Sequence, residues 1–142
     1  MNNCQIIYIG LNIAAKDLNI NVPNYDFVSG CFFSTPHITA MYLPSEDTIL
    51  FNEDWIKSAD TNEVLATSFH EVRHVYQKKQ IDLYFSNRKV SECAETIFRW
   101  KKEFDYYHQP NSSENEKKYV YQEIEKDSIF YASKLITNIF KY

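Results

Sequence analysis

The chain has 142 residues, 44% of them hydrophobic, which is enough for one domain, residues 1–142, with a single hydrophobic core. Its 15 basic and 19 acidic residues are interspersed and give a formal net charge of −4, which argues against direct binding of nucleic acid. No run approaches the ~20 apolar residues that a membrane span needs.

The cysteine count and the N-terminus favour a cytoplasmic protein. The three cysteines, at positions 4, 31 and 93, form no C-x-x-C pair, which argues against a disulfide framework and against a thiolate zinc site. The first residues lack the basic start of a signal peptide.

The first half of the chain predicts a helix followed by a small sheet. Apolar residues at helical spacing favour a helix over roughly residues 4 to 18, with a strand as the alternative. Three β-type runs follow: Phe27–Phe33, Ile38–Leu43 and Thr48–Phe51. The turn composition of residues 44–47 joins the last two as a hairpin. We therefore expect a three-stranded, largely antiparallel sheet.

The second half predicts helices. Asp60 and Glu63 resemble a capping box ahead of a helix that ends near Gln80. Its buried stripe would be Leu65, Phe69, Val72 and Tyr76, and a second helix carries Cys93, Ile97, Trp100, Phe104 and Tyr107 and ends before Pro110. Ser113 and Glu116 repeat the capping pattern ahead of a final helix, whose inward residues would be Tyr121, Ile124, Ser128, Tyr131 and Leu135. The predicted fold class is α+β, with the sheet early and the helices late.

The first of these helices carries the pattern His-Glu-x-x-His at His70, Glu71 and His74. Residues four apart lie on one helical face, so the two imidazoles can bind one zinc ion. Glu71 lies beside them, in position to act as general base toward a metal-bound water. The alternative is two solvated histidines beside a helical glutamate.

A catalytic zinc ion needs a third protein ligand and an open position for water. On the final helix, Glu123 and Glu125 are candidates, but they point about 200° apart, so they cannot both be ligands. Glu92 and Glu95 in the preceding helix stay open. The inward stripe of the final helix runs beside Glu125 and modestly favours it.

The segment His-Glu-Val-Arg-His-Val-Tyr-Gln at 70–77, preceded by Ile-Leu-Phe-Asn at 49–52, resembles the ImmA/IrrE-like zinc metallopeptidases of bacteria and phages. These are gluzincins, in which a late helix supplies a glutamate as third ligand. Residues 125–132 match one form of the family's late motif at Glu125, Asp127 and Ala132, while Ser128 and Tyr131 depart from it. A second alignment takes Glu123 as the ligand with Asp127 supporting a zinc-bound histidine; we prefer Glu125.

The resemblance implies a zinc-dependent peptidase acting on an intracellular protein, such as a repressor encoded beside it. The hairpin before the active helix would offer an edge strand along which an extended peptide lies antiparallel. The family often works with a helix-turn-helix partner, so any contact with DNA would be through another protein.

Several polar residues near these motifs have open roles. Asp127 is a candidate to accept a hydrogen bond from a ligating imidazole, or is an ordinary exposed residue. Arg73 and Gln77 either pin neighbouring helices or are solvated. Tyr84, Tyr107 and Tyr119 are candidates to stabilise an oxyanion, and we interpret His37 and His108 as structural or solvated.

These motifs are compatible with two functions. In the first, His70, His74 and Glu125 bind Zn²⁺ and Glu71 shuttles the proton in peptide hydrolysis. In the second, the same fold and zinc form an interaction module without turnover, in a phage or mobile-element regulatory system. The retained Glu71 favours the enzyme, because a scaffold has no physical need for it. The sequence does not give the oligomeric state.

Overall fold

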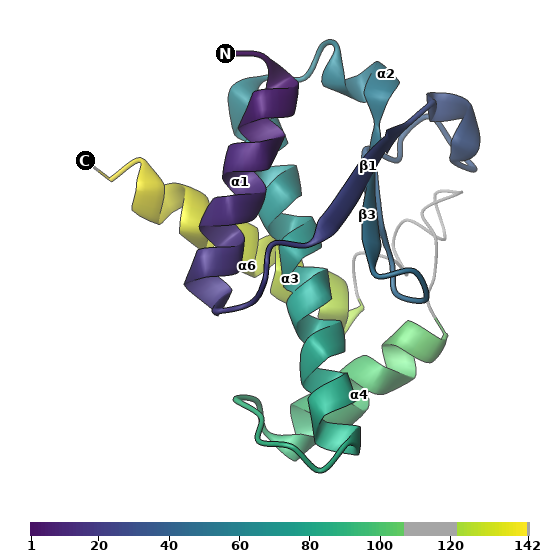
Figure 1. The fold of residues 1–142 in the computed structure, drawn as a ribbon, viewed down its shortest axis with the longest axis vertical. Coiled ribbons are helices and arrows are strands. Elements are labelled where there is room, and N and C mark those ends of the chain that lie inside the picture. Colours follow the sequence, from purple (N-terminus) through teal and green to yellow (C-terminus); the bar gives the residue numbers. More distant parts are fainter. Residues whose placement is uncertain (107–121, 142) are drawn as a thin grey trace.

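The computed structural model describes residues 1–106 and 122–141, in which helices pack against a small sheet (Figure 1). The elements in chain order are α1 (Asn3–Leu18), β1 (Asn24–Val28), the short 3-10 helix η1 (Gly30–Phe32), β2 (Ala40–Leu43), β3 (Thr48–Asn52), α2 (Glu53–Ile56), α3 (Thr61–Phe85), α4 (Ala94–Asp105) and α6 (Glu123–Ile139). The predicted α+β class is confirmed.

The sheet has three strands in the order β1-β3-β2, so β2 lies at an edge. The hairpin strands β2 and β3 are antiparallel, as expected from the turn between them, and β1 pairs with β3 in parallel. The sheet is therefore mixed, and not largely antiparallel as predicted. Asp47 closes the hairpin in the left-handed conformation, and its carboxylate accepts a hydrogen bond of 2.8 Å from the Tyr42 hydroxyl.

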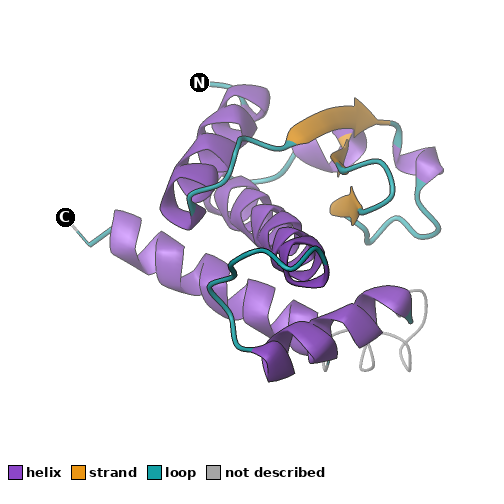
Figure 2. Ribbon diagram, turned by 60° about the horizontal axis from the view of Figure 1, so that its bottom comes forward, coloured by secondary structure: helices purple, strands orange, loops and turns teal. Residues whose placement is uncertain are grey.

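Helix α3 lies in the middle of the molecule, between the sheet and α6 (Figure 2). Its predicted cap is confirmed, because Asp60 and Glu63 form a reciprocal capping box. The predicted apolar stripe is also confirmed: Phe69 and Val72 are fully buried and Leu65 and Tyr76 nearly so. The main core joins Leu65, Phe69 and Val72 to buried residues of α1 and β3, and so fixes α3 against the sheet.

The first predicted strand was misplaced. β1 ends at Val28, and the following residues form η1 instead of continuing the strand to Phe33. The Ser29 hydroxyl accepts from the Cys31 N–H at 3.3 Å, and the Gly30 N–H donates to the Asp54 carboxylate at 2.9 Å. These bonds turn the backbone away from the ladder, because local side-chain acceptors compete with strand pairing.

Helix α3 continues past the predicted end near Gln80. Ile81 belongs to a second buried cluster, with Ile97 and Trp100 of α4 and Ile124 of α6. Burial of Ile81 in this cluster stabilises the additional helical turn. The helix ends where Asn87 adopts a left-handed conformation. Cys93 is exposed at the N-terminal boundary of α4 and is not part of its buried stripe, contrary to the prediction.

The final helix is described from Glu123 onward. Its N-terminus is capped from α4, because the Glu103 carboxylate accepts from the backbone N–H groups of Glu123 and Ile124 at 2.7 and 3.0 Å. The predicted inward residues Ile124, Ser128 and Leu135 are buried. The predicted start at Ser113 and Glu116, together with Tyr107, His108, Tyr119 and Tyr121, lies outside the described residues.

Among the described residues, no helix combines the length and apolar character needed to cross a membrane.

The crossing of α1 and α3 depends on Gly10. A Cβ atom at this position would lie 2.9 Å from the Ser68 Cβ of α3, closer than side-chain atoms tolerate. We expect Gly10→Leu to lower the free energy of unfolding by about 1–3 kcal/mol, measured by urea denaturation. The matched control is Lys16→Leu on the exposed face of α1, for which a change within ~0.5 kcal/mol is expected. Equal losses from both variants would contradict the role of this crossing.

Candidate metal centre

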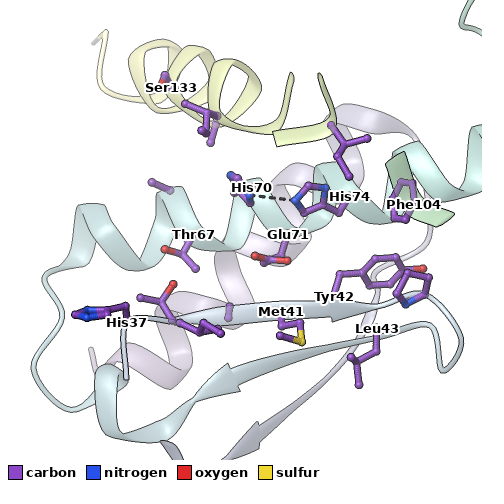
Figure 3. A pocket seen from close by; sticks show the side chains of 18 residues that line it. His37, Met41, Tyr42, Leu43, Thr67, His70, Glu71, His74, Phe104 and Ser133 are labelled. Carbon is purple, nitrogen blue, oxygen red and sulfur yellow. Dashed lines mark hydrogen bonds between the residues drawn. The ribbon is translucent and has the colours of Figure 1, made fainter. Parts of the chain in front are cut away.

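Helix α3 presents His70, Glu71 and His74 toward a groove between β2 and α6 (Figure 3). The two histidines are one turn apart on the same face, and their Nε2 atoms lie 3.1 Å from each other. His74 and Glu71 are buried, whereas the His70 side chain is 16% exposed. The pair of imidazoles predicted from the sequence is therefore formed by local helix geometry.

Helix α6 brings Glu125 to both imidazoles. One carboxylate oxygen lies 2.8 Å from His70 Nε2 and the other lies 3.0 Å from His74 Nε2. The Glu125 side chain is fully buried. A buried carboxylate requires positive or hydrogen-bonding partners, and here both imidazoles of the predicted ligand pair serve as such partners.

The other candidate third ligands lie elsewhere. Glu123 is 44% exposed and is paired with Lys126 at 3.8 Å. The Glu92 carboxylate accepts from the Tyr76 hydroxyl, and Glu95 pairs with Arg99 on the surface of α4. Within the described residues, the group of His70, His74 and Glu125 is the one that could hold a metal ion.

The geometry of this group fits a small divalent cation. Its three ligand atoms all lie within 4.8 Å of one another. Tetrahedral ligands at 2.0–2.1 Å from zinc are separated by about 3.3 Å, close to the 2.8–3.1 Å found here among the nearest donor atoms. Two imidazole nitrogens and one carboxylate are also donors that zinc accepts.

The electrostatics of the group favour a bound cation. Burial acts to raise the pKa of Glu125, but the charge of His74 and the hydrogen bonds from both imidazoles outweigh it and hold the pKa far below its usual range. Burial acts to lower the pKa of His74, but the Glu125 carboxylate outweighs it and raises the pKa to about 9. The buried carboxylate is thus compensated by positive charge, which either a proton or a metal ion can supply.

Glu71 has a different environment. Its burial raises the pKa of the carboxyl group, and the nearby charges of His74 and His70 only partly oppose this shift. The Tyr42 backbone N–H of β2 hydrogen-bonds to the carboxylate, while Oε2 is buried without a hydrogen-bond partner. Leaving such an atom unpaired in a folded protein costs about 1–3 kcal/mol of folding free energy. Buried polar atoms without a partner are therefore rare, and they are typical of sites that bind a ligand or water.

Arg73 and Gln77 pin α3 to α6, one of the two roles considered for them. Arg73 forms hydrogen bonds of 2.7 and 3.1 Å with the Asp127 carboxylate, and the Gln77 side chain reaches Ile124, Asp127 and Ser128. The side chain that hydrogen-bonds to His74 Nδ1 is Gln77 and not Asp127. The Asp127 carboxylate instead binds Arg73 and the amide nitrogen of Gln77.

The groove beside these residues has a volume of about 540 Å³. It is bounded by the edge strand β2 and the segment before it, by α3, by α6 and by Phe104 of α4 (Figure 3). His37 lies in its wall, a position that sequence reasoning missed because no pattern links it to the motif. Tyr84 is not at the groove; it packs against Phe85 and Phe98.

Comparisons of the chain with protein-family models, with curated proteins and with solved structures found no match. The interpretation of this centre therefore depends on its own residues: a potential metal-binding group of two histidines and a glutamate, beside a groove.

Proposed function

We propose that the protein is a zinc-dependent metallopeptidase of the gluzincin type. The observation that carries this proposal is the buried, unpaired Oε2 of Glu71 beside the converging donors of His70, His74 and Glu125. A metal centre that served only to stabilise a fold would be closed by a fourth protein ligand and would have no use for a buried carboxylate at its open side. An interaction module therefore explains the three donors but not Glu71.

In this proposal the three residues hold the metal and Glu71 moves the proton. A zinc ion bound by His70, His74 and Glu125 would supply Lewis acidity, which lowers the pKa of water and polarises a carbonyl group. Glu71 would accept the proton of the attacking water at Oε2 and return it to the leaving amine nitrogen. Burial raises the pKa of Glu71 above its usual range, which makes the carboxylate a stronger base toward the proton of the water.

The edge strand would bind the substrate. β2 pairs with β3 on one side only. The 2.9 Å hydrogen bond from Asn52 N–H to the Thr39 carbonyl shows which residues direct their backbone groups toward β3, since every second residue of an antiparallel strand does so. By this alternation the backbone groups of Ala40 and Tyr42 face away from β3, toward the groove. An extended peptide lying antiparallel to β2 would pair with the backbone groups of Ala40 and with the Tyr42 carbonyl, since the Tyr42 N–H donates to Glu71, and would bring its backbone past Glu71.

We further propose, from the resemblance of the motifs at 70–77 and 125–132, that the substrate is an intracellular protein such as a repressor. We accordingly propose that the enzyme acts in the cytoplasm. The three cysteines are free and exposed, which suits a reducing compartment.

The test is cleavage of a diverse peptide mixture by zinc-loaded protein, with new termini identified by mass spectrometry. We expect cleavage at defined bonds, lost when zinc is removed by a chelator and restored when it is returned. Stoichiometric zinc without any cleavage, in peptides or in a co-expressed protein mixture, would contradict the peptidase and favour the interaction module.

A further inference from the structure

His74 is held from both sides of its ring. Its Nε2 faces Glu125 and His70, while its Nδ1 lies 2.9 Å from Gln77 Oε1 and 3.2 Å from Ser128 Oγ. Gln77 and Ser128 are both fully buried, so these contacts are shielded from solvent. The two residues come from different helices, α3 and α6.

The orientation of the Gln77 amide follows from its other neighbours. Its nitrogen lies 3.0 Å from the Ile124 carbonyl oxygen and 2.8 Å from Asp127 Oδ2. A backbone carbonyl and a carboxylate only accept hydrogen bonds, so the NH₂ group must face them and Oε1 must face the imidazole. Since Oε1 can only accept, Nδ1 of His74 carries a proton, and Nε2, which faces the Glu125 carboxylate, is the nitrogen that can give up its proton to bind a metal ion.

Asp127 is in turn fixed by Arg73. The guanidinium group binds the Asp127 carboxylate and lies 4.5 Å from the centroid of the Tyr76 ring and 5.2 Å from that of Tyr131. Stacking of this kind restricts a long side chain to one position. The amide of Gln77 is thus set by a chain of contacts that ends on α6, the helix that also carries Glu125.

We propose that Gln77 is a positioning residue for the metal centre: it locks His74 in the Nδ1–H form, leaves Nε2 free to bind metal, and couples this ligand to α6. This inference rests on the proposed metal site. A neutral amide is suited to the role, because it adds no negative charge to a buried centre that already contains Glu71 and Glu125. A carboxylate at the same place would need further compensation.

The first test compares zinc affinities by competition with a chelator. Gln77→Met conserves volume but removes the strong acceptor, and we expect zinc to bind about 10- to 100-fold more weakly. The control is Gln80→Met, a buried glutamine of the same helix that accepts from the Ser91 N–H at 2.8 Å and does not touch the centre. Gln77→Glu keeps an acceptor at Nδ1 but sets a carboxylate against Asp127, whose Oδ2 lies 2.8 Å from the amide nitrogen of Gln77, so it should bind zinc more tightly than Gln77→Met and more weakly than the wild type.

The second test detects the protonation of each ring nitrogen directly. In zinc-loaded wild type, nitrogen-detected NMR of the histidine rings should show an exchange-protected proton on His74 Nδ1 and metal on Nε2; in Gln77→Met the protection should be lost. Metal on Nδ1, unchanged zinc affinity in Gln77→Met, or an equal loss in Gln80→Met would overturn the inference, as would a wild type that binds no zinc. Peptide hydrolysis enters none of these readouts, so a failure of the peptidase proposal alone leaves the inference standing.

Discussion

Replacing Glu71 by Gln is expected to slow peptide hydrolysis by about two to four orders of magnitude while zinc remains bound. The amide has almost the shape of the carboxylate and can still accept from the Tyr42 N–H, but its oxygen cannot take up a proton. Glu71 also makes none of the contacts among His70, His74 and Glu125 that define the candidate metal group. The same preparation of the variant should therefore have lost its turnover but kept its zinc.

The measurement is the cleavage rate of the best peptide from the mixture, with zinc per chain determined by elemental analysis. Glu123→Gln is the matched control, since this glutamate is near the N-terminus of α6 and partly exposed. Its rate should equal that of the wild type. A Glu71→Gln variant that retains a rate within tenfold of the wild type would remove Glu71 from the role of general base.

Replacing Glu125 by Ala is expected to abolish stoichiometric zinc binding. Wild type should carry about one zinc ion per chain, because two imidazoles and a carboxylate complete the protein ligands of an open site. Without Glu125 the two histidines lose the only carboxylate that contacts both of them in the described part of the chain. The remaining pair of ligands should bind zinc too weakly to survive purification.

The comparison that decides between the two alignments is Glu123→Ala, which should keep its zinc. Circular dichroism of each variant checks that the overall helix content is kept. Zinc retained in Glu125→Ala, or lost in Glu123→Ala with the helix intact, would contradict the assignment of the third ligand and return the choice to Glu123.

The sequence by itself determined those features that depend on residues close together in the chain. The capping box of Asp60 and Glu63, the stripe of Phe69 and Val72, and the pairing of His70 with His74 all depend on residues three or four positions apart. A helix places such residues together whatever surrounds it. The α+β class could be predicted for the same reason, since periodicity is a property of each segment alone.

Predictions that depended on competition between local and distant contacts were less accurate. The β-type composition of Phe27–Phe33 overstated the first strand, because Ser29 and the distant Asp54 bind backbone N–H groups there. The extension of α3 beyond Gln80 could not be predicted from its own residues. It depends on the burial of Ile81 against Trp100, a residue of another helix.

The residues of α3 are sufficient to place two histidines and a glutamate on neighbouring positions of one helix, but the completion of the centre depends on how the helices pack. Glu125 lies 55 positions from His70, and whether it or Glu123 faces the imidazoles depends on the rotation of α6 about its axis. That rotation is set by the burial of Ile124 and Ser128 and by the bonds from Gln77 and Arg73 to α6. The buried, unpaired oxygen of Glu71 likewise depends on the packing of α3 beside a groove that β2 and α6 also line, and packing is a property that no single segment contains.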